Sequence, residues 1–418
     1  MSTIPIDFSK ANSNPFRPRE GEKILDKGNA LCPSARTNHL PGRPVGGVPI
    51  RHRPQMGVPP QNTVQWGSAN TDVRTNMHKQ GRVQIEDDGL VHKLNVLTLK
   101  PDDLPNETSD HVMEAPRQFN LTKICPEGSI PIERTQRNDQ FGGNHVYKSP
   151  PYFLQQAPIL GIDGYVHEYA TIVDTGAYYG AKATMSLWNP KVETPHEFSL
   201  SQMWLISADK KTTLEAGWMV YPQLYGDSQT RFFIFWTFNF NLQADGYRTG
   251  CYNLHCPGFV QTNNRFPLNG VLRPISVYGG DQFDITIQIF KGRKTRNWWL
   301  YLQGIPMGYW PNELVEGLAR GARLATFGGE VAYKRSTQRR VTSTQMGSGH
   351  FASEGFRKSS FFRNVMVVNT SNWYGIPGHT KDDVTSSACY DVRAALVRST
   401  AWGYFFYYGG PGRSDKCS

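Results

Sequence analysis

The sequence predicts an all-β protein, in which an antiparallel two-sheet β-sandwich follows a small β-rich domain. The chain of 418 residues contains 40 Gly and 28 Pro, and its aromatic content is 12%. This mixture favours short strands and many turns over long helices. Strand-like runs follow one another closely after residue 160. The alternation of strands and helices that is typical of parallel sheets is absent, which favours a sandwich.

The chain divides into four parts. Residues 1–60, rich in Pro, Arg and Gly, are expected to form an extended or partly disordered arm. Residues 61–140 form the small β-rich domain. Residues 141–164 are a loop-like and exposed connector. Residues 165–418 form the sandwich.

Strands are expected at several places along these parts. In the small domain they fall at 81–85 and 92–97. Residues 232–236 are apolar throughout, which indicates a strand covered on both faces, whereas 284–289 alternate and indicate one buried face. Aromatic strands follow at 297–302 and 402–407. One short helix is expected from Pro311, with an apolar side formed by Leu314, Leu318 and Leu324.

Composition also limits the partners. No apolar run is long enough to cross a membrane as a helix, so no membrane partner is expected. The net charge of +10 raises the question of nucleic acid, and basic side chains gather at 291–296 and 334–340. Both clusters fit solvated loops between strands. Neither belongs to a helix-turn-helix or RNA-binding pattern, so we expect no nucleic-acid partner.

Two glutamates stand in similar settings of glycine and aromatic residues. Glu215 belongs to Leu-Glu-Ala-Gly-Trp at 214–218, and Glu330 to Gly-Gly-Glu-Val at 328–331. Two facing carboxylates that share a proton can hydrolyse a peptide bond, because one takes a proton from water and the other protonates the leaving nitrogen. A single glutamate would be interpreted as the partner of an Arg or Lys. The matching settings favour a catalytic pair.

The order of motifs around these glutamates resembles the neprosin family, the plant-type glutamic peptidases that cut after proline. The shared motifs include Tyr-Gly-Asp at 225–227, Gly-Cys-Tyr-Asn-Leu-His-Cys-Pro-Gly-Phe-Val-Gln at 250–261 and Gln-Met-Gly-Ser-Gly-His-Phe at 345–351. The run Cys-Pro-Glu-Gly-Ser-Ile-Pro-Ile-Glu-Arg-Thr at 125–135 is similar to the end of the family's activation peptide.

The resemblance implies an activity and the residues that perform it. Residues 61–140 would be an inhibitory pro-domain, and residues 165–418 the catalytic domain of a glutamic prolyl endopeptidase that is made as a pro-enzyme. Glu215 and Glu330 match the family's catalytic glutamates, and their shared proton implies an acidic working pH. The substrates would be proline-containing peptides or proteins. No cofactor and no metal are expected.

Three residues near these motifs are candidates for the substrate groove. Trp218 and Tyr225 offer aromatic faces on which a prolyl ring packs, and the amide of Gln345 can hold the tetrahedral oxyanion. His350 stands alone in a glycine-rich turn, and we interpret it as structural.

Two other functions fit parts of this pattern. Glycosidases also use paired carboxylates on β-sandwiches. An aromatic-rich extracellular sandwich can also bind cell-wall polymers or another protein, with both glutamates structural, although a passive binder has little need of a pro-segment. The sequence has no His-Glu-x-x-His helix and no Gly-x-Ser-x-Gly elbow between a strand and a helix, which disfavours zincins and α/β-hydrolases.

The six cysteines favour disulfides over a reactive thiol. Cys251 and Cys256 are close enough in the sequence to bridge one tight loop, and a Cys389–Cys417 bridge would anchor the C-terminal segment. Cys32 and Cys125 remain as the third pair. In the neprosin family such a bridge lies in the activation region. Zinc bound by Cys251, His255 and Cys256 is the alternative, but no second ligand pair follows at a suitable spacing.

The family is normally secreted, and disulfides agree with an extracellular location. Residues 1–30 lack the apolar core of a signal peptide, so we expect a secreted or extracellular protein although no signal peptide is visible. The connector offers bonds after Pro150, Pro151 and Pro158 that an enzyme of this specificity could cut in itself.

Overall fold

The computed structural model describes residues 30–31, 84–86, 89–91, 104–106, 125, 129–133, 165–237, 250–255, 258–334, 341–394 and 401–418. The expected connector at 141–164 lies outside the described residues, as do most residues before it.

The part from residue 165 onward is built from strands whose pairings are all antiparallel. In chain order these strands are β5 (Tyr165–Ser186), β6 (Phe198–Ile206), β7 (Thr213–Val220), β8 (Arg231–Thr237), β9 (Gly250–Tyr252), β10 (Val260–Gln261), β11 (Asp284–Lys291), β12 (Trp298–Leu302), β13 (Ile305–Trp310), β14 (Ala322–Lys334), β15 (Ser360–Asn369), β16 (Tyr374–Gly375), β17 (Thr380–Val384), β18 (Asp391–Ala394) and β19 (Phe406–Gly409).

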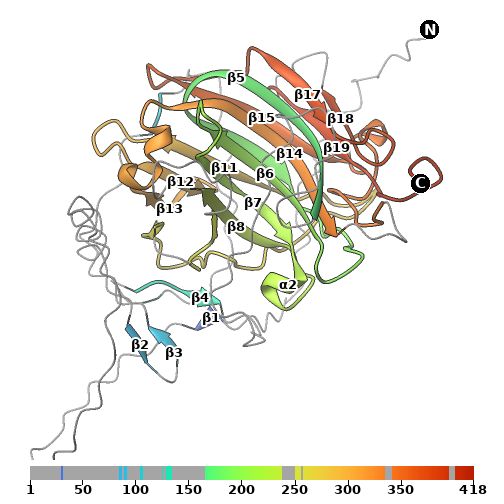
Figure 1. Cartoon of the computed structure of the whole chain (residues 1–418), viewed down its shortest axis with the longest axis horizontal. Helices are drawn as coiled ribbons and strands as arrows, with labels where there is room; N and C mark the ends of the chain where they lie inside the picture. Colours follow the sequence, from blue (N-terminus) through green and yellow to red (C-terminus); the bar gives the residue numbers. More distant parts are fainter. Residues whose placement is uncertain are drawn as a thin grey trace, which may run out of the picture.

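Strand β5 organises the sheet. One hydrogen-bonded path runs β10-β13-β12-β11-β5-β14-β6-β7-β8-β9. Residues 165–178 of β5 pair with β14, and residues 180–186 pair with β11. Strands β15 and β17 also pair with β5. Figure 1 shows β5 as a long curved strand, so the sheet curls and its two halves form separate layers.

The main hydrophobic core lies between these two layers. It contains Trp218 of β7 and Ile234 of β8 together with Ile287 of β11 and Leu300 of β12. Burial of side chains from both halves of the sheet in one cluster confirms the antiparallel sandwich predicted from the sequence. The two layers are continuous, however, because a strand of 22 residues passes through both.

Each layer also carries an apolar cluster on its outer face. The β6–β8 outer cluster consists of Tyr169, Phe198, Leu200, Trp204, Ile206, Met219, Tyr221, Tyr225, Phe233, Phe235, Tyr252 and Ala332. The β11–β13 outer cluster consists of Phe290, Trp299, Tyr301, Tyr309, Met366, Val368 and Tyr374.

Most of the predicted strands of this domain are confirmed. Strand β8 is buried at every residue, as its continuous apolar run predicts, and β11 begins with the expected alternation before both faces become buried. The predicted strand at 402–407 was too early, since β19 begins at Phe406. The predicted helix was too long: the 3₁₀ helix η3 covers Asn312–Leu318, and Leu324 lies in β14.

Other helical segments are short. Helix α2 (Pro222–Tyr225) begins with a proline and ends at Gly226, whose φ of 79° favours glycine. The 3₁₀ helix η4 covers Ala352–Glu354. Among the described residues, none of the helices has the length and apolar character needed to cross a membrane.

The described residues before 165 form two small strand pairs. Strand β1 (Ala30–Leu31) pairs with β4 (Ile132–Glu133), and β2 (Gln84–Glu86) pairs with β3 (Gly89–Val91). The strand expected at 81–85 is therefore displaced toward β2, and the one expected at 92–97 lies outside the described residues.

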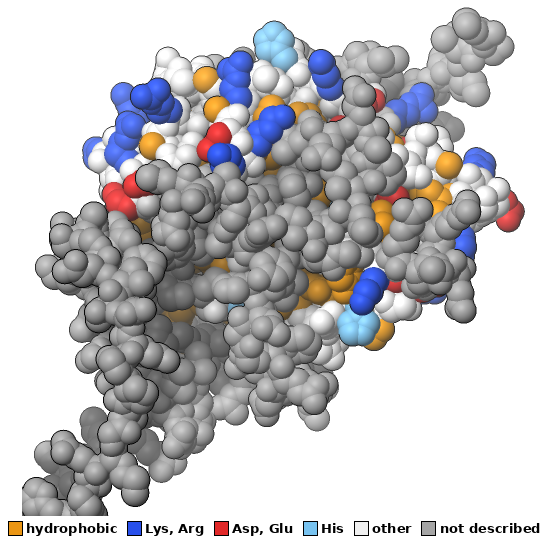
Figure 2. Space-filling model, viewed as in Figure 1, with side chains coloured by type: hydrophobic (Ala, Val, Ile, Leu, Met, Phe, Trp, Pro, Cys, Tyr) orange, Lys and Arg blue, Asp and Glu red, His pale blue; other side chains and the backbone are white. Residues whose placement is uncertain are grey.

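One of the two basic segments is partly buried. Lys291 of β11 is buried, and its Nζ donates hydrogen bonds to Asn312 Oδ1 at 2.6 Å and Arg296 O at 3.0 Å. Burial lowers the pKa of Lys291 to about 8. On the face shown in Figure 2, Lys and Arg side chains are spread over the described surface with acidic side chains between them.

Candidate active site

Glu215 lies in the middle of β7 on the face of the β6–β8 outer cluster. Side chains alternate along a strand, so Met219 shares this face whereas Leu214 belongs to the main core. The side chain is fully buried. Its Oε2 accepts a hydrogen bond from Gln202 Nε2 at 2.9 Å, and its Oε1 accepts one from Thr213 Oγ1 at 2.9 Å. Donors of this kind favour the ionised form of a carboxyl group.

Glu330 lies on the same face in β14. Its neighbour Val331 belongs to the main core, and Ala332 belongs to the β6–β8 outer cluster. Tyr169 of β5 is its direct cross-strand partner, and the Tyr169 hydroxyl donates to Glu330 Oε1 at 3.2 Å. His167 Nδ1 lies 2.7 Å from the same oxygen. Both Glu330 and His167 are buried, which strengthens their electrostatic interaction.

Strand β6 lies between the two glutamates. Glu330 is opposite Leu200 of β6, and Glu215 is opposite Trp204. Gln202 occupies the position between these two and points to the same face, where it contacts Glu215. Glu330, Gln202 and Glu215 therefore lie along a diagonal across β14, β6 and β7, with the Gln202 amide in the middle.

Glycines flank Gln202 on both sides. Its cross-strand partners are Gly217 of β7 and Gly328 of β14. A Cβ added at Gly217 would lie 1.9 Å from Ser201 O, and one added at Gly328, whose φ is +151°, would lie 2.3 Å from Ala170 O. Both positions require glycine for this close approach. In the cross-strand row formed by Gly328, Gln202 and Gly217, only Gln202 therefore has a side chain on the glutamate face.

Tyr252 of β9 lies within electrostatic range of both glutamates. It is in the same cross-strand row as Glu215, with Phe235 between them. Burial raises the pKa of the Tyr252 phenol well above its ordinary value, and the charges of Tyr221, Glu330 and Glu215 raise it further. The Tyr252 phenol therefore interacts electrostatically with both carboxylates. Glu215 and Glu330 are 115 residues apart in the sequence, so the sequence does not indicate that one phenol interacts with both.

The structure separates the residues expected in the groove. Trp218 is buried in the main core, on the opposite face of β7 from Glu215, and its Nε1 donates to Ser186 O at 2.8 Å. A residue three positions along a strand faces the other way, so the expected groove position of Trp218 is corrected to a core position. Tyr225, at the end of α2, belongs to the β6–β8 outer cluster and receives a hydrogen bond from Asn253 Nδ2 at 3.2 Å.

Gln345 and His350 make contacts away from the glutamate face. Lys191 N donates to Gln345 Oε1 at 3.0 Å, and Gln345 N donates to Lys191 O at 2.9 Å. The amide expected to hold an oxyanion therefore fixes the loop between β5 and β6. His350 Nδ1 lies 2.9 Å from Glu354 Oε1, and its ring centroid lies 4.2 Å from that of Tyr278, which agrees with a structural role.

Sequence reasoning missed His167, Tyr169, Gln202, Thr213 and Tyr252. Thr213 stands two residues before Glu215, and His167 two residues before Tyr169, so alternation alone places each pair on one face. The register between strands, which brings these pairs to the glutamates, has no local signal in the chain.

The zinc alternative is not supported by the state of its ligands. Cys251 is disulfide-bonded and has no free thiolate to offer. Cys125 is disulfide-bonded as well. The partners expected for these two residues, Cys256 and Cys32, lie outside the described residues. Within the described ranges, no group of three His, Cys, Asp or Glu side chains could hold a metal ion.

A comparison with protein families supplies the remaining observation. The family model for Neprosin matches residues 195–411, slightly more than half of the chain. The chain belongs to the neprosin family. Both Glu215 and Glu330 fall within the matched residues. Membership of this family supports a glutamic-type peptidase, as the motifs indicate.

Solved structures of two peptidases are distantly similar to this neprosin-family chain. Scytalido-glutamic peptidase with a peptide-based transition-state analogue is 10% identical, with a TM-score of 0.31 over 59% of this chain and 97% of that chain. SCP-B, an eqolisin-family peptidase in complex with the tripeptide Ala-Ile-His, is 8% identical, with a TM-score of 0.31 over 58% of this chain and 96% of that chain.

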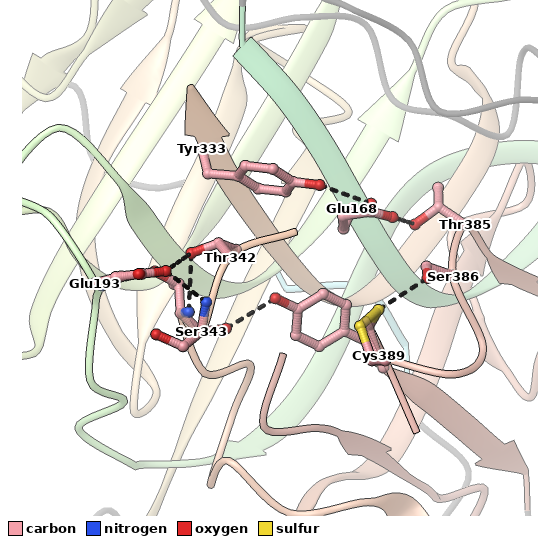
Figure 3. Close-up of a disulfide and its surroundings, with 11 residues drawn as sticks. Glu168, Glu193, Tyr333, Thr342, Ser343, Thr385, Ser386 and Cys389 are labelled. Atoms are coloured by element: carbon pink, nitrogen blue, oxygen red, sulfur yellow. Dashed lines mark hydrogen bonds between the residues drawn. A yellow bond between two sulfur atoms is a disulfide. The ribbon is translucent and has the colours of Figure 1, made fainter. Parts of the chain in front are cut away.

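Behind the site of this neprosin-family chain, β5 is held by a further buried carboxylate. Glu168 faces away from His167 and accepts hydrogen bonds from the hydroxyls of Tyr333, at 3.3 Å, and Thr385 (Figure 3). Thr385 also binds the backbone of Tyr169, through a bond from Tyr169 N to Thr385 Oγ1 at 2.8 Å. Burial raises the pKa of Glu168. Thr385 thus fixes the strand that presents Tyr169 and His167 to the site.

The C-terminal segment is anchored nearby. Cys389 and Cys417 form the expected disulfide, with a Cα–Cα distance of 5.0 Å. Figure 3 shows Ser386 beside Cys389, and Glu193 accepting hydrogen bonds from Thr342 and Ser343. These contacts join the β5–β6 loop, the segment after β14 and the C-terminus into one support.

Proposed function

We propose that this chain is an endopeptidase of the glutamic type that cuts after proline at acidic pH, with Glu215 and Glu330 as its catalytic pair. The observation that carries the proposal is the placement of two fully buried carboxylates on one face of one sheet. Each has polar side-chain partners, which makes burial of a carboxylate tolerable.

The pair would act as one unit that shares a proton. At acidic pH one glutamate is ionised and takes a proton from the attacking water, while the other is protonated and gives its proton to the leaving nitrogen. Gln202 and Thr213 favour the ionised form of Glu215, so Glu215 would take the proton from water and Glu330 would supply the proton to the leaving nitrogen. Because the two carboxylates interact, the apparent pKa values belong to the pair and not to either residue.

Aromatic side chains around the pair support the preference for proline. The β6–β8 outer cluster includes Tyr225, Phe233, Phe235 and Tyr252 on the face that carries Glu215. A prolyl ring is apolar and rigid, and it packs well on aromatic faces. Tyr225, expected from the sequence in the substrate groove, is therefore proposed for this role.

We further propose that residues 61–140 act as an inhibitory pro-domain. Described residues of this segment contact the domain that follows. Asn106 N donates to Asn372 O at 2.9 Å and Tyr374 N donates to Asn106 O at 2.9 Å, so Asn106 forms a β-bridge at the start of β16. Cys125 is held by Asn264, whose Nδ2 donates to Cys125 O at 3.0 Å.

Digestion of a defined peptide library by wild type and E330Q at pH 4 tests this function. We expect wild type to cut after proline, and E330Q to be slower by several orders of magnitude because the substitution keeps the shape but removes the titrating group. A parallel assay with polysaccharides tests the glycosidase alternative. Cleavage of glycans without cleavage of peptides, or full activity of E330Q, would contradict the proposal.

A further inference from the structure

Tyr252 has a buried hydroxyl with no hydrogen-bond partner among the described residues. Its side chain is 3% exposed. A buried hydroxyl without a hydrogen bond destabilises the folded protein, so a group of this kind in a packed cluster needs an explanation. The ring alone would serve the cluster equally well as phenylalanine.

The ring of Tyr252 packs against two phenylalanines of β8, the strand between Tyr252 and Glu215. Its centroid is 4.7 Å from that of Phe235, which shares the cross-strand row of Glu215, and 6.1 Å from that of Phe233. Phe233 is the cross-strand partner of Gly217, in the row that continues to Gln202. Contact with both phenylalanines means that the ring leans from the row of Glu215 toward the row of Gln202.

The backbone around Tyr252 is held firmly. The preceding residue, Cys251, is disulfide-bonded. The following residue, Asn253, has a left-handed φ of 51° and bonds to both backbone groups of Ile234, since Asn253 N donates to Ile234 O at 2.9 Å and Ile234 N donates to Asn253 Oδ1 at 3.1 Å. Asn253 Nδ2 also bonds to Tyr225. The phenol is therefore preorganised before substrate binds.

We propose that Tyr252 is a third catalytic residue, whose hydroxyl donates a hydrogen bond to the carbonyl oxygen of the bond being cut. This role rests on the proposed peptidase function of Glu215 and Glu330. Gln345, the residue expected from the sequence to hold the oxyanion, is fixed at Lys191, and Tyr252 supplies a donor on the glutamate face instead.

The hydroxyl acts without giving up its proton. Water forms a bond to the carbonyl carbon and loses one proton to the ionised glutamate, while the π electron pair moves to the carbonyl oxygen. That oxygen, now negative, accepts the hydrogen bond from Tyr252. The pair of electrons then returns to re-form the carbonyl, the C–N bond breaks, and the nitrogen takes the proton of the other glutamic acid. Burial and the neighbouring carboxylates keep the phenol protonated throughout.

The test compares Y252F with wild type and E330Q on one proline-containing peptide. Removal of one preorganised donor to an oxyanion lowers kcat by about 10²–10³-fold. We expect KM to stay within about twofold, because the interaction forms only in the transition state. The pH profile should keep its shape, since the glutamate pair still titrates. Y309F, which removes the hydroxyl of a buried tyrosine in the β11–β13 outer cluster, is the control and should keep wild-type kcat.

Stability distinguishes catalysis from structure. The Tyr252 hydroxyl has no partner among the described residues, so Y252F should keep the unfolding temperature of wild type or raise it slightly. Full activity of Y252F beside an inactive E330Q overturns the role of Tyr252 and leaves the peptidase intact. A large fall in the unfolding temperature of Y252F also overturns it, because the hydroxyl would then be structural. Inactive wild type overturns the peptidase function itself.

Discussion

Gln202 Nε2 donates a hydrogen bond to Glu215 Oε2 over 2.9 Å, from a position flanked by glycine on both neighbouring strands. The amide is buried, and no other described residue bonds to its Oε1. It therefore has a fixed direction, set by Glu215. We regard Gln202 as a positioning residue that holds the carboxylate and favours its ionised form.

Replacement of Gln202 by Leu should lower kcat about 10–100-fold, because a hydrogen bond to a charged group contributes about 1.5–3 kcal/mol. Loss of the donor makes the ionised form of Glu215 less favourable, so the acid limb of the kcat profile should move to higher pH. Steady-state kinetics from pH 2.5 to pH 7 measure both effects, in steps of about half a unit. Q288L, at a buried glutamine of β11 in the other layer, is the control and should leave the acid limb in place.

Trp218 should affect stability and not specificity. Its indole donates to Ser186 O inside the main core. W218F removes this donor and leaves a buried carbonyl unpaired, which should cost about 1–3 kcal/mol of unfolding free energy. KM for proline peptides should stay within about twofold of wild type. Urea unfolding and steady-state kinetics measure the two quantities. A large rise in KM with unchanged stability would return Trp218 to the substrate groove.

Trp218 and Glu215 belong to one sequence motif, but their side chains lie on opposite faces of β7. Aromatic runs and glycine-rich turns predicted the sandwich, since these patterns are local. The motif around Glu215 pointed to the correct strand, but membership of a motif does not say which face a residue occupies. Alternation would have separated Trp218 from Glu215. The pairing of Glu330 with Tyr169 across β5 and β14 depends on register, which the whole sheet decides.

Asp383 makes the fold more stable in acid. It lies in β17 opposite Thr171, and burial raises its pKa from 3.8 to about 6. The folded protein binds this proton more tightly than the unfolded chain, so stability rises as pH falls through 6 toward 4 and is lost as pH rises. D383N removes the penalty at neutral pH. Its unfolding temperature should exceed that of wild type at pH 7.5 and equal it below pH 4. Exposed Asp415 offers the control D415N, for which no such difference is expected.

The disulfide Cys389–Cys417 should stabilise the C-terminal support. It closes a loop of 28 residues, and a loop of this length contributes about 3.5 kcal/mol through the entropy of the unfolded chain. The double substitution C389S/C417S avoids a free thiol and should lower the unfolding free energy by about this amount. Denaturant unfolding without reductant measures it. The Thr342 hydroxyl donates to Glu197 Oε2 at 2.6 Å, and the Tyr390 hydroxyl donates to Thr344 O at 2.8 Å. Equal stability of the double variant and wild type would mean that such hydrogen bonds hold the segment without the disulfide.

Activation should be autocatalytic and triggered by acid. The contacts of Asn106 and Cys125 hold the proposed pro-domain against the following domain, and the connector offers bonds after Pro150, Pro151 and Pro158. Six of the 11 histidines lie in residues 1–150, so acidification adds positive charge to this part of a chain whose net charge is already +10. The resulting repulsion weakens the binding of the proposed pro-domain to the following domain.

Intact-mass spectrometry after a shift from pH 7 to pH 4 should show a product of wild type that begins between residues 137 and 161. E215Q should remain full length under the same conditions, because its shape is kept and its titrating group is lost. Equal cutting of both proteins would point to a separate protease, and full-length wild type at pH 4 would make residues 1–150 a permanent part of the protein.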